Sequence, residues 1–193
     1  MSLSTPVPVI HTHRLLLRPV RADDLKVAQA IHGDPQTNRF NPKGPASLET
    51  TSSNLFHWVE HWKDKGFGYW AVCDREQPET VLGFGGLQDA TFGSRTGLNL
   101  YFRFAVDAWG KGYASEMVEA ALDVAFRHLA RNEVIGLVRP DNLPSRRTLE
   151  RARMIVDGAR MIVDGELDDV PGQPHSLLYS LSAERYLSPE SFM

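Results

Sequence analysis

The chain has 193 residues, enough for one domain with its own hydrophobic core. Its formal net charge of −3 gives no electrostatic basis for binding nucleic acid or an anionic membrane surface. The first ten residues lack the features of a signal peptide, and no segment is long and apolar enough to predict a membrane span. Because Cys73 is the only cysteine, no disulfide can form within the chain. We therefore expect a cytoplasmic protein in which Cys73 is an inert, half-buried thiol.

Apolar spacing in the first half of the chain predicts two helices and three strands. Residues 15–19 form an apolar run typical of a strand, and helical spacing follows over residues 22–31. Ser47 precedes a second helical pattern that extends to about position 65. Two further apolar runs, residues 68–73 and 80–87, are expected to pair as antiparallel strands.

The second half of the chain continues the mixture of strands and helices. The expected elements are strands over residues 98–106, 133–138 and 177–181, a helix after Gly112, and a short helix over residues 145–153. No linker-like segment divides the sequence. We therefore expect a single α+β domain over residues 1–193, with a mixed sheet.

A seven-residue sequence, Ala-Arg-Met-Ile-Val-Asp-Gly, occurs at residues 152–158 and again at residues 159–165. One duplication of this length is too short to predict a solenoid. Each copy resembles a short strand that ends at Asp-Gly, so both are expected to extend the sheet, and the two could pair as a hairpin across residues 157–158. A duplication without function is the alternative. Residues 165–175 are expected to form an exposed, mobile loop.

The segment between the strand at residue 98 and the next helix is the most informative part of the sequence. It reads Trp109-Gly110-Lys111-Gly112-Tyr113. Glycine lacks a Cβ, so a ligand can approach the backbone closely. The first N–H groups of the following helix have no partners within it, and together with the helix dipole they favour a phosphate. The two aromatic residues add apolar surface, which favours a ligand that combines a pyrophosphate with an apolar arm.

This strand, turn and helix resemble the acyl-CoA motif of the GNAT N-acetyltransferases, and more narrowly that of the branch containing the RimJ and RimL ribosomal-protein acetyltransferases. Three other segments resemble the same branch in the same order. They are His13-Arg14-Leu15-Leu16-Leu17-Arg18-Pro19, Val81-Leu82-Gly83-Phe84-Gly85-Gly86-Leu87, and Asp141-Asn142-Leu143-Pro144-Ser145. The resemblance implies a mostly antiparallel central sheet flanked by helices, and an enzyme that transfers an acetyl group from acetyl-CoA to a primary amine.

The resemblance also implies which residues bind acetyl-CoA. Backbone N–H groups of the turn would hold the pyrophosphate, and the end of the preceding strand would hold the pantetheine arm and the thioester. Asn142 would bond the cofactor arm, and Ser145 would bind the departing thiolate or give it a proton. The resulting set of cofactor-binding residues is Phe104, Ala105, Val106, Trp109, Gly110, Lys111, Gly112, Tyr113, Ala114, Asn142 and Ser145, with Ser145 as the catalytic residue.

Simpler roles remain open for several of these residues. Asn142 is also typical of a turn or helix start, and Ser145 of a helix N-cap. Arg146 and Arg147 are as well suited to a solvated surface as to a phosphate of the adenosine moiety. Related sequences often carry a glutamate where this chain has Asn99, and an amide cannot accept the proton of the amine. The general base is therefore unassigned, and we expect direct attack by the amine in a ternary complex.

Two other functions compete with acetyl transfer. The amide at Asn99 also fits an acyl-CoA-binding sensor that has lost its chemistry. His57-Trp58-Val59-Glu60-His61 matches the pattern of inverted zinc proteases, although a third ligand is not evident. We expect no metal. The acceptor, a protein N-terminus or a small-molecule amine, is not specified by the sequence, and a homodimer is compatible with it.

Overall fold

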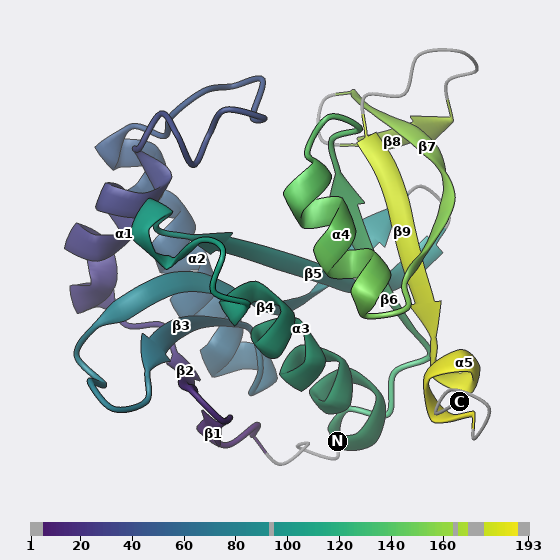
Figure 1. Cartoon of the computed structure of the whole chain (residues 1–193), viewed down its shortest axis with the longest axis horizontal. Helices are drawn as coiled ribbons and strands as arrows, with labels where there is room; N and C mark the ends of the chain where they lie inside the picture. Colours follow the sequence, from purple (N-terminus) through teal and green to yellow (C-terminus); the bar gives the residue numbers. More distant parts are fainter. Residues whose placement is uncertain (1–5, 93–94, 164–165, 170–175, 189–193) are drawn as a thin grey trace. The chain divides into compact units, whose positions relative to one another are not determined.

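The computed structural model describes residues 6–92, 95–163, 166–169 and 176–188, and their contacts divide into two compact units. Unit 1 comprises residues 1–88 and 101–120, and unit 2 comprises residues 89–100 and 121–193. Three elements continue from one unit into the other: strands β4 (Val81–Phe92) and β5 (Arg95–Phe104) and helix α3 (Tyr113–Asp123) (Figure 1). Each unit combines helices with antiparallel strands, which confirms the α+β class.

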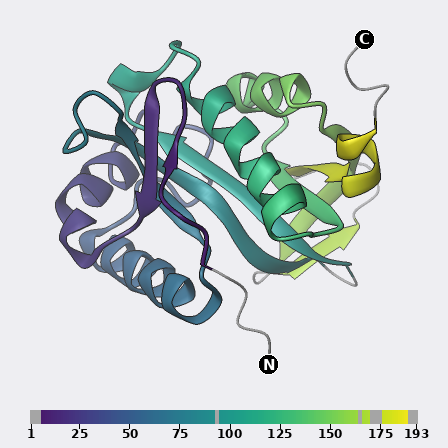
Figure 2. The same cartoon turned by 90° about the horizontal axis from the view of Figure 1, so that it is seen from below.

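The strands of unit 1 follow the order β1-β2-β3-β4-β5. Strands β1 (Ile10–His11) and β2 (Leu15–Pro19) form an antiparallel hairpin, drawn in dark purple in Figure 2. Strand β3 (Tyr69–Asp74) pairs antiparallel with β2 and with β4. The strands expected from residues 15–19, 68–73 and 80–87 are therefore confirmed, and so is the antiparallel pairing of the last two.

Two helices of unit 1 lie side by side, α1 (Leu25–His32) and α2 (Leu48–Lys65) (Figure 1). The helix expected over residues 22–31 begins as a 3-10 turn, η1 (Ala22–Asp24), and continues as α1. Helix α2 begins after Ser47 as expected, because the Ser47 hydroxyl accepts a hydrogen bond from the Thr50 N–H (3.1 Å). It ends at Gly66, whose φ of +72° is the left-handed conformation common at helix ends.

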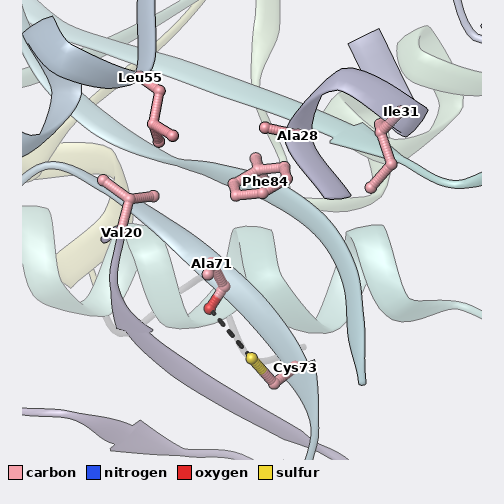
Figure 3. Close-up of a cluster of buried hydrophobic side chains, with 7 residues drawn as sticks. All are labelled: Val20, Ala28, Ile31, Leu55, Ala71, Cys73 and Phe84. Carbon is pink, nitrogen blue, oxygen red and sulfur yellow. Dashed lines mark hydrogen bonds between the residues drawn. The ribbon is translucent and has the colours of Figure 1, made fainter. Parts of the chain in front are cut away.

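Both helices are held to the sheet by a buried apolar cluster (Figure 3). Its buried members are Val20, Ala28, Ile31, Leu55, Ala71, Cys73 and Phe84. Helix α1 supplies Ala28 and Ile31, α2 supplies Leu55, and β3 and β4 supply the last three. Each large side chain buried in this way stabilises the fold by about 1.5–3 kcal/mol. The cluster fixes α1 against the sheet and so positions the polar residues at its C-terminal end.

Helix α3 packs closely on β4 because β4 carries glycines where the helix crosses it. A Cβ at Gly85 would lie 3.0 Å from the terminal methyl carbon of Met117, and Met117 and Val118 are fully buried. The glycine-rich run in β4 thus brings the N-terminal part of α3 close to the sheet. After Asp123 the helix widens into a π-helical segment, η3 (Val124–His128), which the sequence does not predict.

The strands of unit 2 follow the order β4-β5-β6-β9-β7-β8. Strand β6 (Glu133–Val138) pairs in parallel with β5 and antiparallel with β9 (Ser176–Ser182), and both strands match their expected positions. Helix α4 (Leu143–Arg151) packs on β6, where a Cβ at Gly136 would lie 3.3 Å from a methyl carbon of Leu149. A short helix that was not predicted, α5 (Ala183–Leu187), follows β9.

The prediction of a hairpin across residues 157–158 is wrong. Strand β7 (Ile155–Val163) continues through most of both copies of the duplicated sequence and pairs with β9, with a register shift between Val156 and Gly158. A β-bulge accommodates the first Asp-Gly, so the ladder with β9 is kept, whereas a turn there would end it. On its other edge, β7 pairs antiparallel with β8 (Glu166–Asp169), which follows the second copy of the duplicated sequence. Both copies therefore extend the sheet.

The loop expected over residues 165–175 is also corrected in part, because residues 166–169 form β8. Residues 165 and 170–175 lie outside the described residues. Within the part of the chain that the structure describes, no helix is long and apolar enough to cross a bilayer.

Candidate functional site

The turn between β5 and α3 has the backbone conformation that its glycines predict. Strand β5 ends at Phe104, and a 3-10 turn, η2 (Val106–Ala108), leads into it. Gly110 and Gly112 have φ angles of +73° and +80°, the left-handed region that favours glycine. No atom lies within 4 Å of the position that a Cβ would take at Gly110. A ligand can therefore approach the backbone there, and only a residue without a side chain leaves that space open.

Backbone N–H groups of this turn are available as hydrogen-bond donors. Helix α3 begins at Tyr113, so its first amides have no acceptor one turn earlier. Among the backbone hydrogen bonds of the described residues outside helices and strands, none is donated by residues 110–115. The next amide, that of Glu116, donates to the Gly112 carbonyl at 3.1 Å. A run of free amides at a helix N-terminus, beside an open glycine, fits the pyrophosphate of a coenzyme.

Some backbone groups just before the turn already form hydrogen bonds within the protein. The Ala105 N–H donates to the Leu82 carbonyl (2.9 Å), and the Phe104 carbonyl accepts from the Trp109 indole N–H (3.0 Å). The Val106 N–H, by contrast, donates no bond of the described set outside helices and strands. A carbonyl can accept a second bond. Within residues 104–106, the Val106 amide and the second lone pairs of the carbonyls therefore remain for a ligand arm.

The ladder between β5 and β6 is short, as a ligand inserted beside β5 would require. Leu98 pairs with Val134 and Asn99 with Ile135, and the ladder extends no further. An amide-bearing arm can bond strand groups that have lost their neighbour, as an added strand would. Asn99 itself is half-buried at the last pair of this ladder.

Trp109 and Tyr113 flank the turn, and each is contacted by an arginine. Trp109 is 38% exposed, and the guanidinium of Arg39 lies 5.3 Å from its ring centroid. The guanidinium of Arg14 lies 4.7 Å from the Tyr113 ring centroid. The aromatic surface beside the turn is therefore held in place by cation–π contacts.

The structure adds Arg14 and Glu116 as residues that fix the turn. Arg14 Nε donates to Glu116 (2.7 Å), and its guanidinium also donates to the Lys111 carbonyl (2.7 Å). Thr12 and the Arg14 N–H donate to the same carboxylate at 2.6 Å and 2.7 Å. Burial raises the pKa of Glu116, but the bonds from Thr12 and Arg14 outweigh it and lower the pKa overall. The contact between these residues, which lie about 100 positions apart, is not predicted by the sequence.

Asn142 and Ser145 lie at the start of α4 in unit 2. Asn142 is the N-cap, because its side-chain oxygen accepts a hydrogen bond from the Ser145 N–H (3.2 Å). Ser145 is therefore not the N-cap, and this corrects one of the two roles that the sequence left open for it. Helix α4 also starts two residues earlier than expected, because Pro144 suits the first turn of a helix. Arg146 is bound to the Pro140 carbonyl (2.9 Å) and the Tyr179 hydroxyl (3.2 Å).

A comparison with known protein families identifies the family of this chain. Residues 14–155 match the model of the acetyltransferase (GNAT) domain. The chain belongs to the GNAT family. It is accordingly an acetyl-CoA-dependent N-acetyltransferase.

Several similar proteins are named as acetyltransferases. The chain is 24% identical over 152 residues to the uncharacterized N-acetyltransferase p20 of Bacillus licheniformis, a match that spans 77% of this chain and 83% of p20. Its fold is similar to that of an acetyltransferase from Agrobacterium tumefaciens, with a TM-score of 0.74 and 23% identity over 94% of this chain and 98% of the other. A spermidine N-acetyltransferase from Vibrio cholerae, solved with CoA and spermine, gives a TM-score of 0.68 at 17% identity, over 92% and 100% of the two chains.

Unit 1 of this GNAT enzyme also contains a buried polar network that sequence reasoning missed. His32 Nδ1 donates to the Ala28 carbonyl (2.8 Å), so its Nε2 accepts from the Tyr101 hydroxyl (2.9 Å). The pKa of His32 is lowered to about 4, chiefly by burial and also by the positive charge of Arg103, against the opposing effect of the hydrogen bond to the Ala28 carbonyl. His32 is therefore neutral at pH 7. Burial raises the pKa of Tyr101, which keeps its proton.

The surroundings of Cys73 do not activate its thiol as a nucleophile. It is fully buried in the apolar cluster of unit 1 (Figure 3), and burial raises its pKa. Its sulfur contacts the Ala71 carbonyl at 3.9 Å. A buried thiol with a raised pKa is a poor nucleophile. Cys73 is more deeply buried than the half-buried position expected from the sequence.

The residues of the zinc-like pattern in α2 do not converge on one point. His57 is exposed, and Glu60 pairs with Lys63 (2.6 Å). His61 Nδ1 donates to the Phe67 carbonyl (2.8 Å). Among the described residues, no group of three or more His, Cys, Asp or Glu side chains is arranged to hold a metal ion.

Proposed function

We propose that this enzyme transfers the acetyl group of acetyl-CoA to a primary amine by direct attack in a ternary complex. The observation that carries the proposal is the β5–α3 turn, with an open left-handed Gly110 and a run of amides without protein partners. In the proposed complex, the amides from Lys111 to Ala114 hold the pyrophosphate. The backbone of residues 104–106 holds the pantetheine arm and directs an N–H, for which Val106 is the available donor, at the thioester oxygen.

We propose that residues 1–193 act as one catalytic domain, in which Asn142 and Ser145 also take part. Asn142 caps α4 with its side-chain oxygen, which leaves its amide N–H₂ to bond the cofactor arm. Ser145 donates its hydroxyl proton to the departing thiolate and regains a proton, through water, from the nitrogen that has formed the amide bond. The nitrogen–carbon bond forms as the carbon–sulfur bond breaks, and no covalent intermediate on the enzyme is involved.

The amine must lose a proton before it attacks, and Asn99 cannot accept one. We propose that water accepts this proton, so that activity rises with pH toward the pKa of the acceptor amine. Cys73 is not part of the proposed reaction, because its thiol is buried and its pKa is raised. The non-catalytic sensor suggested by Asn99 is the alternative that the experiment below addresses.

The acceptor is proposed only as a class, a protein N-terminus or a small-molecule amine. Structures of similar fold include ones titled as a ribosomal-protein-S5-alanine acetyltransferase of Vibrio fischeri and a spermidine N-acetyltransferase of Vibrio cholerae, both at 18% identity or less. They are compatible with the RimJ/RimL-like branch and with small amines alike. A cytoplasmic location and a homodimer also remain part of the proposal, and they rest on the sequence.

A screen of primary amines with release of free CoA thiol as the readout tests the proposal. We expect turnover with at least one acceptor class and retained turnover in Cys73→Ala, with no acetyl group trapped on the wild-type protein. CoA binding without turnover of any amine would favour the sensor. An acetylated Cys73 that is required for turnover would contradict direct transfer.

A further inference from the structure

Arg103 of β5 is held in one position by neutral partners. One of its terminal N–H groups donates to the side-chain oxygen of Asn38, and the guanidinium also bonds the Tyr101 hydroxyl. Asn38 is 3% exposed and its own amide donates to the carbonyls of His32 (2.7 Å) and Asp34 (2.8 Å). The oxygen that faces Arg103 is therefore fixed by the backbone at the end of α1.

The other end of this network is neutral as well. Tyr101 donates to His32 Nε2, and His32 donates to the Ala28 carbonyl, so the hydrogen bonds run in one direction from Arg103 to α1. The low pKa of His32 and the raised pKa of Tyr101 leave both groups uncharged at pH 7. The network therefore carries the single positive charge of Arg103.

No ion pair found among the described residues includes Arg103. Its side chain is half-buried, so water only partly compensates its charge. A guanidinium has five N–H donors, and the bonds to Asn38 and Tyr101 leave most of them for another acceptor. Arg39, adjacent to Asn38 in sequence, brings a second positive charge to Trp109 on the same side of unit 1. The local field favours an anionic group.

Arg103 also stands at a suitable point along β5. It directly precedes Phe104, whose backbone is proposed to hold the thioester arm, and its side chain lies on the face of β5 that contacts Asn38 and, through Tyr101, α1. We propose that Arg103 binds a carboxylate of the acceptor, so that the preferred substrates are primary amines that also carry a carboxylate. This inference rests on the proposed function and narrows its substrate class.

Matched acceptors test the inference with the wild-type enzyme. The panel consists of alanine, phenylalanine, β-alanine and 4-aminobutyrate, each with its carboxamide, and of peptides that begin Ala-Asp or Ala-Asn. The carboxylate member of at least one pair should have a kcat/KM roughly 10- to 100-fold higher, the range expected for hydrogen bonds to a charged group. The amino acids and the peptides separate a free metabolite from a protein N-terminus. Spermine, which carries only positive charges, should be a poor acceptor.

Binding of the acetylated products tests the same idea without turnover. N-acetyl derivatives of each pair, as carboxylate and carboxamide, are titrated by calorimetry into the CoA complex of wild type, Arg103→Gln and Arg103→Lys. The preference for the carboxylate should disappear in Arg103→Gln. It should be partly kept in Arg103→Lys, which keeps the positive charge but loses the paired N–H donors of the guanidinium. Lys26→Gln, which removes an exposed positive charge from α1, is the matched control and should bind as wild type.

The outcomes separate the two proposals. Equal or better turnover and binding of the carboxamides in every pair would overturn the role of Arg103 and leave acetyl transfer intact. Absence of turnover with every amine would contradict acetyl transfer, and the binding titration would then still decide for or against the carboxylate site. Unchanged CoA affinity in the Arg103 variants confirms that they are folded.

Discussion

At the scale of single residues, the turn after β5 depends on the absence of a side chain at Gly110. Its φ of +73° disfavours any other residue, and the space beside it is open. Gly44 has nearly the same φ, +70°, and equally open surroundings, but it lies in the connection between α1 and α2. The two glycines therefore differ in location and not in backbone strain, which makes Gly44 a matched control.

Gly110→Glu should lower the affinity for CoA by roughly 100-fold, because it places a negative charge where the pyrophosphate must approach. Gly44→Glu carries the same strain and charge and should bind CoA as wild type does. Isothermal titration with CoA measures both. If the two variants bind CoA equally well, the pyrophosphate does not lie at this turn.

Ser145 can be separated from its neighbour in the same way. Because Asn142 caps α4 with its own side chain, Ser145→Ala should leave stability within about 0.5 kcal/mol of wild type, whereas Asn142→Ala should cost about 1 kcal/mol. If Ser145 gives a proton to the thiolate, its variant should lower kcat at least roughly 10-fold with little change in CoA affinity. Steady-state kinetics and chemical denaturation measure the two effects, and full turnover in Ser145→Ala would reject the catalytic role.

At the scale of elements, hydrogen-bonded polar side chains join helices to strands that are distant in sequence. Arg14 and Glu116 join the β1–β2 hairpin to α3, and His32 and Tyr101 join α1 to β5. Hydrophobic periodicity predicts β2, α1, α3 and β5 separately. It does not predict which polar residues meet, because a charged or polar residue on a helix face is more often solvated than paired.

The α1–β5 junction should make stability depend on pH. The pKa of His32 in the folded protein, about 4, lies below the ordinary value of 6.5, so the folded state binds fewer protons. Its contribution is complete above pH 6.5 and is lost as the pH falls from 6.5 toward 4, by at most about 3 kcal/mol. Urea unfolding of wild type and His32→Gln between pH 7.5 and 4.5 should show a steeper loss in the wild type.

The exposed His57 on α2 provides the control for this measurement. His57→Gln should follow the wild-type pH dependence, since its side chain is exposed to solvent and takes no part in the α1–β5 junction. Equal pH dependence of wild type and His32→Gln would mean that the imidazole of His32 is not held neutral at this junction.

At the scale of the whole molecule, the residues proposed to bind the cofactor belong to two separate segments of the chain, residues 104–114 and Asn142 with Ser145. Saturation with CoA should therefore slow amide hydrogen exchange in two separate peptides, one over residues 110–116 and one over residues 142–149, because a ligand stabilises every segment that binds it. Peptides from α5 serve as the control and should exchange unchanged. Protection confined to residues 110–116 would remove Asn142 and Ser145 from the cofactor site.

Residue patterns with local causes were sufficient for most of the fold. The strand and helix positions followed from apolar periodicity, the start of α2 from Ser47, and the phosphate-binding turn from glycines that must adopt positive φ. The same order of segments was sufficient to recognise the GNAT family. The duplicated sequence was misjudged locally, because its first Asp-Gly has the residues of a turn, yet the ladder with β9 holds it in a bulge within a continuous strand.

The sequence by itself thus determined most of the elements, the family and the residues of the turn, since each depends on neighbours within a few positions. Only the tertiary structure decided the partners across long separations: Glu116 with Arg14, His32 with Tyr101, and Arg103 with Asn38. Such pairs depend on which faces of distant elements are buried together. The energetic reason is that a buried polar group must find a hydrogen-bond partner wherever the packing of the apolar side chains places one.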